Sequence, residues 1–365
     1  MELYGKLKSR DGNICFSPYS ISTAFAMAYA GAHGETERQI AQVLHFNSDQ
    51  SKLHSLFGEL QKKLTSAEQQ KGIDLHMANI LWTQKGHPFL PSFLEHATNY
   101  ETSIKQVDFA TQSEAARQQI NGWAGQQTRG TITNILAEGE LDSLTSLVLV
   151  NVLYLNSHWE VPFDAKETKT AAFHLADGRT KDVQMMHQKN KHRYHFFEDD
   201  TVQLVELSYT NYKLSMLILL PKDVNGLAKL EAAVNTKSLS KWEHDAEYLE
   251  VELFLPRFKF ESGLELAPEL KKLGIMDAFT GVANFSGIDG TKMLRISTAL
   301  HKSFVKVDEQ GTEASFITRL AYTAQSMVEH VGPAILRADH PFIFLVRDCG
   351  TGSILFMGRV MDPGN

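Results

Sequence analysis

Three histidines in one short segment are the nearest approach to a metal-binding pattern in this sequence. His187, His192 and His195 lie beside the basic residues Lys189 and Arg193. A zinc site needs three or four ligands at suitable spacing, and here no thiolate or carboxylate partner completes such a set. We therefore interpret the segment as a solvated basic hairpin and predict no metal or other cofactor.

Catalytic signatures are also missing from the sequence. It contains no Gly-x-Ser-x-Gly elbow, no His-Glu-x-x-His and no phosphate-binding glycine loop. Cys15 lies in an apolar segment and is expected to be a small buried hydrophobe, and Cys349 lies in an expected turn. Two cysteines make no disulfide framework. The sequence predicts a protein that is not an enzyme.

A polar residue inside a long apolar run is a better candidate for function. Residues 147–155 are apolar and partly β-branched except for Asn151, which favours a central strand covered on both faces. A buried Asn151 requires hydrogen-bond partners, so other polar side chains must meet it.

Helices are expected mainly early in the chain. Ser17 is predicted as an N-cap with Pro18 at the first helical position, and the helix should end at Gly31. Thr36 and Gln39 fit a capping box for a second helix.

Strand patterns dominate after residue 144, although one strand is expected near 77–82. The further predicted strands are 203–207, 214–220, 249–254, 258–260, 304–307, 342–346 and 354–359. Helices followed by strands indicate an α+β fold with large antiparallel or mixed sheets. No linker or repeat interrupts the chain, so we predict a single domain over residues 1–365.

Composition excludes two classes of partner. The 365 residues are 43% hydrophobic and carry a net charge of −7 with both signs interspersed. A nucleic-acid binder usually shows a concentrated basic stripe, so no nucleic acid is expected. No apolar stretch reaches about 18 residues, so no membrane span is expected.

The first residues do not resemble a signal peptide. We expect the protein to be cytoplasmic, or extracellular if a signal was removed.

Segments along nearly the whole chain resemble the serpins, a superfamily of serine protease inhibitors. The matching segments are 13–22, 151–159, 255–260, 284–288, 301–314, 339–344 and 356–360. Their joint order over most of the chain is far more specific than any one of them. The resemblance implies a serpin fold, in which helices pack around three β-sheets with a large central sheet and an exposed reactive-centre loop, here about 309–336. It also implies a metastable monomer that forms a covalent complex with a target serine or cysteine protease by suicide inhibition.

The resemblance also implies two clusters in the central sheet. One, the shutter, must break when the sheet opens. It is formed by Ser17, Ser20, Asn151 and His301. The other, the breach, is where the loop first enters the sheet and includes Trp159.

The loop itself can be examined as a potential strand. Alternate residues of a strand face opposite sides, and the set from Thr312 to Tyr322 is uncharged while the other set holds both charges. The segment also lacks proline between Glu309 and Gly332. Gly311 suits a hinge because it permits unusual backbone angles. The hinge residues are Glu309, Gly311, Thr312, Glu313, Ala314 and Phe316.

The bond that the protease cuts is implied by the family's spacing. Counting seventeen residues with Glu309 as the first places it at Gln325–Ser326. Tyr322 is a shifted alternative.

Phe316, Ile317 and Gln325 support a second hypothesis, because inhibitory members usually have small residues at the first two positions and glutamine is unusual before the cut bond. A large side chain on the inserting face would slow insertion. The alternative is a non-inhibitory serpin that acts as a binding, carrier or chaperone-like protein, with the loop cleaved as a substrate.

Overall fold

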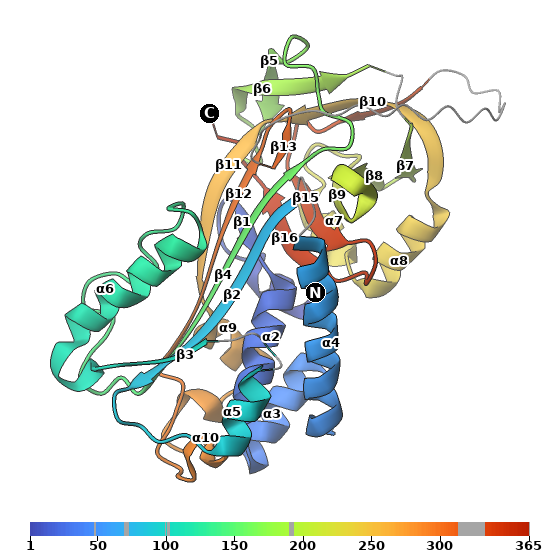
Figure 1. Cartoon of the computed structure of the whole chain (residues 1–365). Helices are drawn as coiled ribbons and strands as arrows, with labels where there is room; N and C mark the ends of the chain where they lie inside the picture. The colour runs from blue at the N-terminus through green and yellow to red at the C-terminus, as the bar shows by residue number, and fades with distance from the viewer. Residues whose placement is uncertain are drawn as a thin grey trace.

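The computed structural model describes residues 1–46, 49–68, 73–98, 100, 103–189, 193–312 and 333–364 (Figure 1). The helices are α1 Glu2–Leu7, α2 Pro18–Tyr29, α3 Gly34–Leu44, α4 Gln50–Glu68, α5 Pro91–Thr98, α6 Phe109–Gln127, α7 Leu227–Ala233, α8 Thr236–Asp245, α9 Leu266–Leu273 and α10 Ser286–Asp289, with 3₁₀ turns at Thr210–Tyr212 and Asp277–Phe279. The strands are β1 Ile14–Phe16, β2 Ile73–Gln84, β3 Ser103–Val107, β4 Leu147–His158, β5 Lys169–His174, β6 Thr180–Gln188, β7 Arg193–Glu198, β8 Val202–Ser208, β9 Leu214–Pro221, β10 Glu247–Pro256, β11 Phe258–Glu265, β12 Thr298–Val307, β13 Gly311–Thr312, β14 Ala334–Arg337, β15 Phe342–Asp348 and β16 Ile354–Val360.

The central sheet is a mixed sheet with the order β11-β12-β4-β2-β3. β12 pairs with β4 in parallel, and so does β2 with β3, whereas β11–β12 and β4–β2 are antiparallel. The two-residue strand β13 also pairs with β4, antiparallel. Figure 1 shows the long strands of this sheet running from the upper end of the molecule to the lower end.

A second sheet, the back sheet, has the order β1-β16-β15-β9-β8-β7 and is antiparallel. It shares β10 with a small upper sheet. The first half of β10 pairs with β7, and the second half pairs with β6 on one side and β14 on the other. The implied three sheets are therefore present, with β10 bending from one into another.

Three apolar clusters hold these layers together. One lies around α2 and the lower helices, one lies between the central and back sheets, and one lies between α6 and the central sheet. β4 contributes to all three, with Leu149, Leu153 and Val150 as examples. A strand covered on both faces cannot alternate polar and apolar residues, which explains the apolar run in the sequence.

The predicted strands are all present, but several are longer than their patterns indicated. β12 starts at Thr298 rather than Phe304, and β11 runs to Glu265. The parts of β11 and β12 that the sequence pattern did not predict either alternate polar and apolar residues or contain His301. Their apolar pattern was therefore too weak to indicate a strand. The predicted first helix is confirmed, since the Ser17 side chain accepts from the Ser20 amide and Pro18 is at its first position.

The predicted capping box was wrong. α3 begins at Gly34, so Thr36 and Gln39 lie inside the helix. The Thr36 hydroxyl accepts from the Asn284 amide, and the Gln39 carbonyl oxygen accepts from the Met276 and Asp277 amides. These side chains bind a distant segment instead of capping their own helix.

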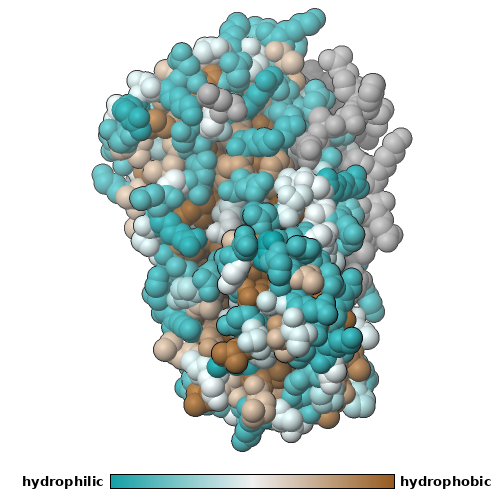
Figure 2. Space-filling model, turned by 90° about the vertical axis from the view of Figure 1, so that its left-hand side faces the viewer, coloured by the Kyte–Doolittle hydropathy of each residue, from teal (hydrophilic) through white to brown (hydrophobic). Residues whose placement is uncertain are grey.

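The outer surface is largely polar where α6 lies. Figure 2 shows that hydrophilic side chains dominate this face, with hydrophobic ones visible between them. Across the described ranges, no helix is both long and apolar enough to cross a membrane.

Candidate functional site

The candidate site is the junction between β4 and β12, which we call the seam. The two strands pair from Val148–Thr298 to Leu153–Ser303. Farther up β4, on the same side, β13 pairs with Ser157 and His158. β2 occupies the other side of β4 along this stretch, so β13 must lie on the seam side. The chain reverses after β12 and begins a new strand at the open end of the seam.

Glycine is required at the start of this new strand. Gly311 has a φ of +144°, and a Cβ there would lie 2.2 Å from the Ser157 carbonyl oxygen. An alanine would therefore meet both a strained backbone and a clash with β4. The geometry explains why glycine stands at this position, and the hinge role implied for Gly311 stays a prediction.

Thr312 is the last described residue of the hinge, and it faces inward. It is 3% exposed, and its hydroxyl is 2.9 Å from the Tyr209 hydroxyl. A buried hydroxyl without a partner would be costly, so Tyr209 stabilises the inserted position of Thr312. Sequence reasoning did not find Tyr209, because nothing in its local pattern sets it apart from other aromatic core residues.

Trp159 closes this end of the seam, and the breach role implied for it stays a prediction. Its ring stacks on Tyr209 with centroids 4.5 Å apart and an interplanar angle of 16°. Its indole nitrogen donates to the Asp308 carbonyl at 3.0 Å, and its amide donates to the Gln310 carbonyl at 2.8 Å. The tryptophan thus binds the reversing turn as well as packing in the core.

Glu309 is held by charge-assisted hydrogen bonds beside the turn. The Arg257 guanidinium donates to its carboxylate at 2.8 and 2.9 Å, and the Thr168 hydroxyl donates to the same group. Burial alone would raise the pKa of Glu309, but these hydrogen bonds outweigh it and hold the pKa below its ordinary value. Glu309 therefore anchors the turn from which the new strand starts.

A row of polar side chains crosses the sheet lower in the seam. His301 on β12, Asn151 on β4 and Asn79 on β2 are register partners on neighbouring strands. His301 Nδ1 lies 2.5 Å from the Asn151 side-chain oxygen, and the Asn151 amide nitrogen donates to the Asn79 oxygen at 2.5 Å. The Ser17 amide donates to His301 Nε2 at 3.0 Å. We call these four residues the latch.

The direction of these bonds requires neutral His301. Nε2 accepts from the Ser17 amide, so the ring proton is on Nδ1 and is donated to Asn151. Complete burial lowers the pKa of His301 to about 3, which agrees with this geometry. Only neutral histidine can accept at one nitrogen and donate at the other.

The latch differs from the implied cluster at two positions. Ser20 lies nearby and its amide completes the α2 cap, but its buried hydroxyl has no hydrogen-bond partner among the described residues. Asn79 is a member that the sequence reasoning missed. Its signal was present, since a polar residue interrupts the apolar strand pattern of β2 as Asn151 interrupts that of β4.

The remaining implied loop residues lie outside the described residues. These are Glu313, Ala314, Phe316, Gln325 and Ser326. Their roles stay predictions.

Two of the three histidines of this segment lie on strands, His187 on β6 and His195 on β7. His187 stacks on Phe254 with centroids 4.2 Å apart, and its Nε2 lies 2.9 Å from a Glu252 oxygen. His195 lies on β7, and His192 is outside the described residues. Within the described ranges, no group of three or more histidine, cysteine or acidic side chains is placed to hold a metal ion.

Comparisons with known proteins agree with this fold. The model of the serpin (serine protease inhibitor) family matches residues 1–363. The leukocyte elastase inhibitor of Bos taurus is 40% identical over 360 residues, covering 96% of this chain and 93% of that protein. The structure of uncleaved ovalbumin has a TM-score of 0.89 at 30% identity, covering 99% of this chain and 97% of that one. Serpin48 of Tenebrio molitor has a TM-score of 0.87 at 32% identity, with coverage of 100% and 95%. A family match over almost the whole length, joined to the same fold, means that this chain belongs to the serpin family.

Proposed function

We propose that this protein is a suicide inhibitor of a serine or cysteine endopeptidase. The observation that carries the proposal is β13, a strand already begun on the seam side of β4. To insert, the cut loop only has to extend β13 from Gly311 and Thr312 between β4 and β12. The inhibitor acts as a monomer and traps one protease in each event.

The protease supplies the nucleophile that cuts the loop, and this chain traps the protease by inserting the cut loop into its sheet. The protease nucleophile attacks the carbonyl carbon of Gln325, and the Gln325–Ser326 peptide bond breaks. The nitrogen of Ser326 takes a proton and leaves as a new amino terminus, while Gln325 stays attached to the enzyme as an ester or thioester. Insertion of the freed strand then drags the acyl-enzyme before water can hydrolyse it.

The energy for insertion comes from the strand that is formed. Thr312 faces the interior, so residues at even intervals after it face the same side. Large side chains contribute about 1.5–3 kcal/mol each on burial, and each net hydrogen bond about 1 kcal/mol. Opening the sheet and ordering the loop oppose this gain.

The names of relatives suggest where to look for the target. Relatives 39 and 40% identical are named leukocyte elastase inhibitors. An elastase-type serine protease is therefore the first candidate. Glutamine is large for the small specificity pocket of such an enzyme, so the cut bond must be measured.

The test mixes the purified protein with serine and cysteine proteases and separates the products on denaturing gels. A covalent band at the summed mass is expected, and mass spectrometry of the released fragment fixes the bond. Thr312→Arg should convert the protein into a substrate, because it places a cation beside the buried Tyr209 hydroxyl. Thr312→Ser keeps the hydroxyl and serves as the control. Trapping by the Arg variant at the wild-type ratio would contradict the proposal.

Phe316 favours the second candidate, a non-inhibitory binding or carrier protein. It is four residues after Thr312 and shares its face if the strand continues. The thermal midpoint before and after the loop is cut distinguishes an inhibitor from a carrier. A large rise in the thermal midpoint after nicking requires insertion, and no rise together with clean cleavage favours the carrier.

A further inference from the structure

A buried histidine with an unsatisfied nitrogen lies on the side of α4 that faces α5. His54 of α4 is only 1% exposed. Its Nδ1 is hydrogen-bonded to the Tyr100 hydroxyl, whereas its buried Nε2 has no hydrogen-bond partner among the described residues. Buried polar atoms are almost always paired, so this nitrogen is available for a ligand.

A second histidine lies against the first. The ring centres of His54 and His96, which is in α5, are 4.7 Å apart, and the ring planes make an angle of 42°. Figure 1 shows α4 and α5 side by side in the lower half of the molecule. His96 is only half-buried, so an ion can reach it from solvent. The torsion that turns its ring has broad energy wells, so a ring nitrogen can be brought toward His54 at little cost.

The distance between the rings suits two ligands of one metal ion. With metal–nitrogen bonds of about 2.0–2.1 Å, two imidazoles on the same tetrahedral or octahedral ion have ring centres about 4.5–5 Å apart. The two helices therefore already lie at a suitable separation.

Tyr100 supplies a further feature of such sites. A metal-bound histidine usually donates its other ring N–H to an oxygen, and this contact fixes the tautomer. Here Nδ1 of His54 can donate to the Tyr100 hydroxyl oxygen, which leaves the lone pair on Nε2 for a metal.

We propose that His54 and His96 form a two-histidine site for a divalent zinc or copper ion. Imidazole suits these metals, whereas magnesium and calcium prefer oxygen ligands. Within the described part of the chain, no third histidine, cysteine or acidic side chain joins the pair. Water must then complete the coordination, so the ion is exchangeable rather than structural. The sequence pattern gave no sign of the site, because the two histidines come from different helices. The site does not depend on how the loop is used.

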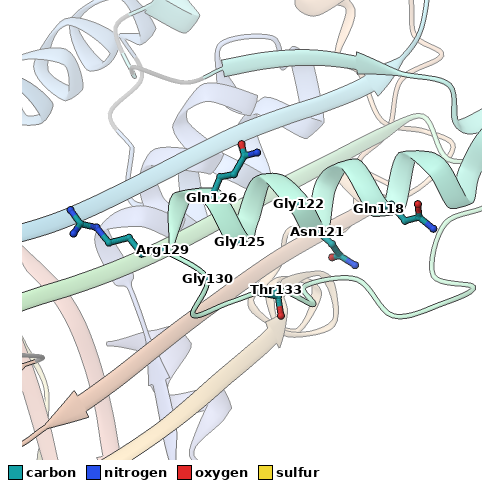
Figure 3. A pocket seen from close by; sticks show the side chains of 8 residues that line it. All are labelled: Gln118, Asn121, Gly122, Gly125, Gln126, Arg129, Gly130 and Thr133. Atoms are coloured by element: carbon teal, nitrogen blue, oxygen red, sulfur yellow. The ribbon is translucent and has the colours of Figure 1, made fainter.

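The hollow beside α6 offers no comparable set of ligands. Figure 3 shows the side chains that line it, and these described residues include no histidine, cysteine or carboxylate. The charged side chain among them is Arg129, a cation that repels a metal ion.

The test is a calorimetric titration of the metal-free protein with ZnCl₂. We expect the wild type to bind one ion. His54→Gln and His96→Gln should each weaken binding by at least about 10- to 100-fold, because even the hydrogen-bond partners of metal ligands contribute that much. His244→Gln is the matched control, since His244, like His96, lies in the last turn of a helix. It should bind zinc as the wild type does.

Two further measurements address the geometry. Tyr100→Phe removes only the hydroxyl and should weaken zinc binding by about 10- to 100-fold. Paramagnetic resonance with Cu²⁺ should show two coordinating imidazole nitrogens in the wild type and one in His96→Gln. If His54→Gln does not fold, the half-buried His96 still decides the question. No saturable binding by the wild type, or equal affinity in the wild type and His96→Gln, would overturn the site and leave the proposed function untouched.

Discussion

Replacing His301 by glutamine removes the titrating group from the latch while keeping the polarity of its hydrogen bonds. The amide oxygen of glutamine can accept from the Ser17 amide, and its nitrogen can donate to the Asn151 oxygen. The variant therefore isolates the effect of charge. We expect the wild type to lose more stability than His301→Gln as the pH is lowered, because only the wild type carries the buried latch histidine.

The magnitude follows from two pKa values. The ordinary pKa of histidine is 6.5, and burial lowers the pKa of His301 to about 3. Above pH 6.5 the residue is neutral in both the folded and unfolded chain and contributes no pH dependence. Below 6.5 the unfolded chain binds a proton that the folded chain refuses, so stability falls until about pH 3. At about pH 5 the loss is roughly 2 kcal/mol, at 1.36 kcal/mol for each pKa unit. Spread over 365 residues, this lowers the thermal midpoint by about 2–3 °C.

The assay compares the thermal midpoints of wild type and His301→Gln at about pH 7.5 and about pH 5. Burial also lowers the pKa of His54, to about 4, which gives the same direction of change. His54 is present in both proteins, so its contribution cancels in the difference. Equal pH dependence of the two midpoints would refute the assignment of a neutral, desolvated His301 to the latch.

Two further substitutions test the hinge. Gly311→Ala should displace β13, since its Cβ would lie 2.2 Å from the Ser157 oxygen; we expect the loop still to be cut but less protease to be trapped, and unchanged trapping on denaturing gels would contradict the geometry. Phe316→Ala should lower the number of cleavages per trapped protease, because overpacking on the inserting face costs about 1–3 kcal/mol; Phe316 lies outside the described residues, and a constant ratio would remove it from the explanation.

Helices and strands could be predicted from the sequence where burial produces a continuous apolar run or where a local capping pattern marks the start of a helix. The apolar run that became β4, and the Ser17–Pro18 start of α2, depend on local rules alone. The resemblance then placed Trp159, Asn151 and His301 in one sheet. Neither the sequence pattern nor the resemblance identified the hydrogen-bond partners that come from distant parts of the chain.

Asn79 and Tyr209 illustrate this limit. Asn79 acquires its role through strand register, which sets it opposite Asn151, and Tyr209 acquires its role through a hydroxyl contact with the distant Thr312. The capping box failed for the same reason. Thr36 and Gln39 have suitable spacing for a cap, but tertiary contacts with residues 276–284 compete for their side chains.

The order of barriers along the seam makes insertion directional. The upper end already holds β13, so the first pair that must part is Leu153–Ser303. The latch pair Asn151–His301 lies two residues farther down, and separating its strands exposes a buried donor and acceptor. A chance opening at the lower end would have no strand to fill it and would close again. An opening at the upper end is filled at once by the residue after Thr312, because β13 is already in register on β4. The cost of breaking the latch would therefore be met by strand already inserted above it, as the proposed function requires.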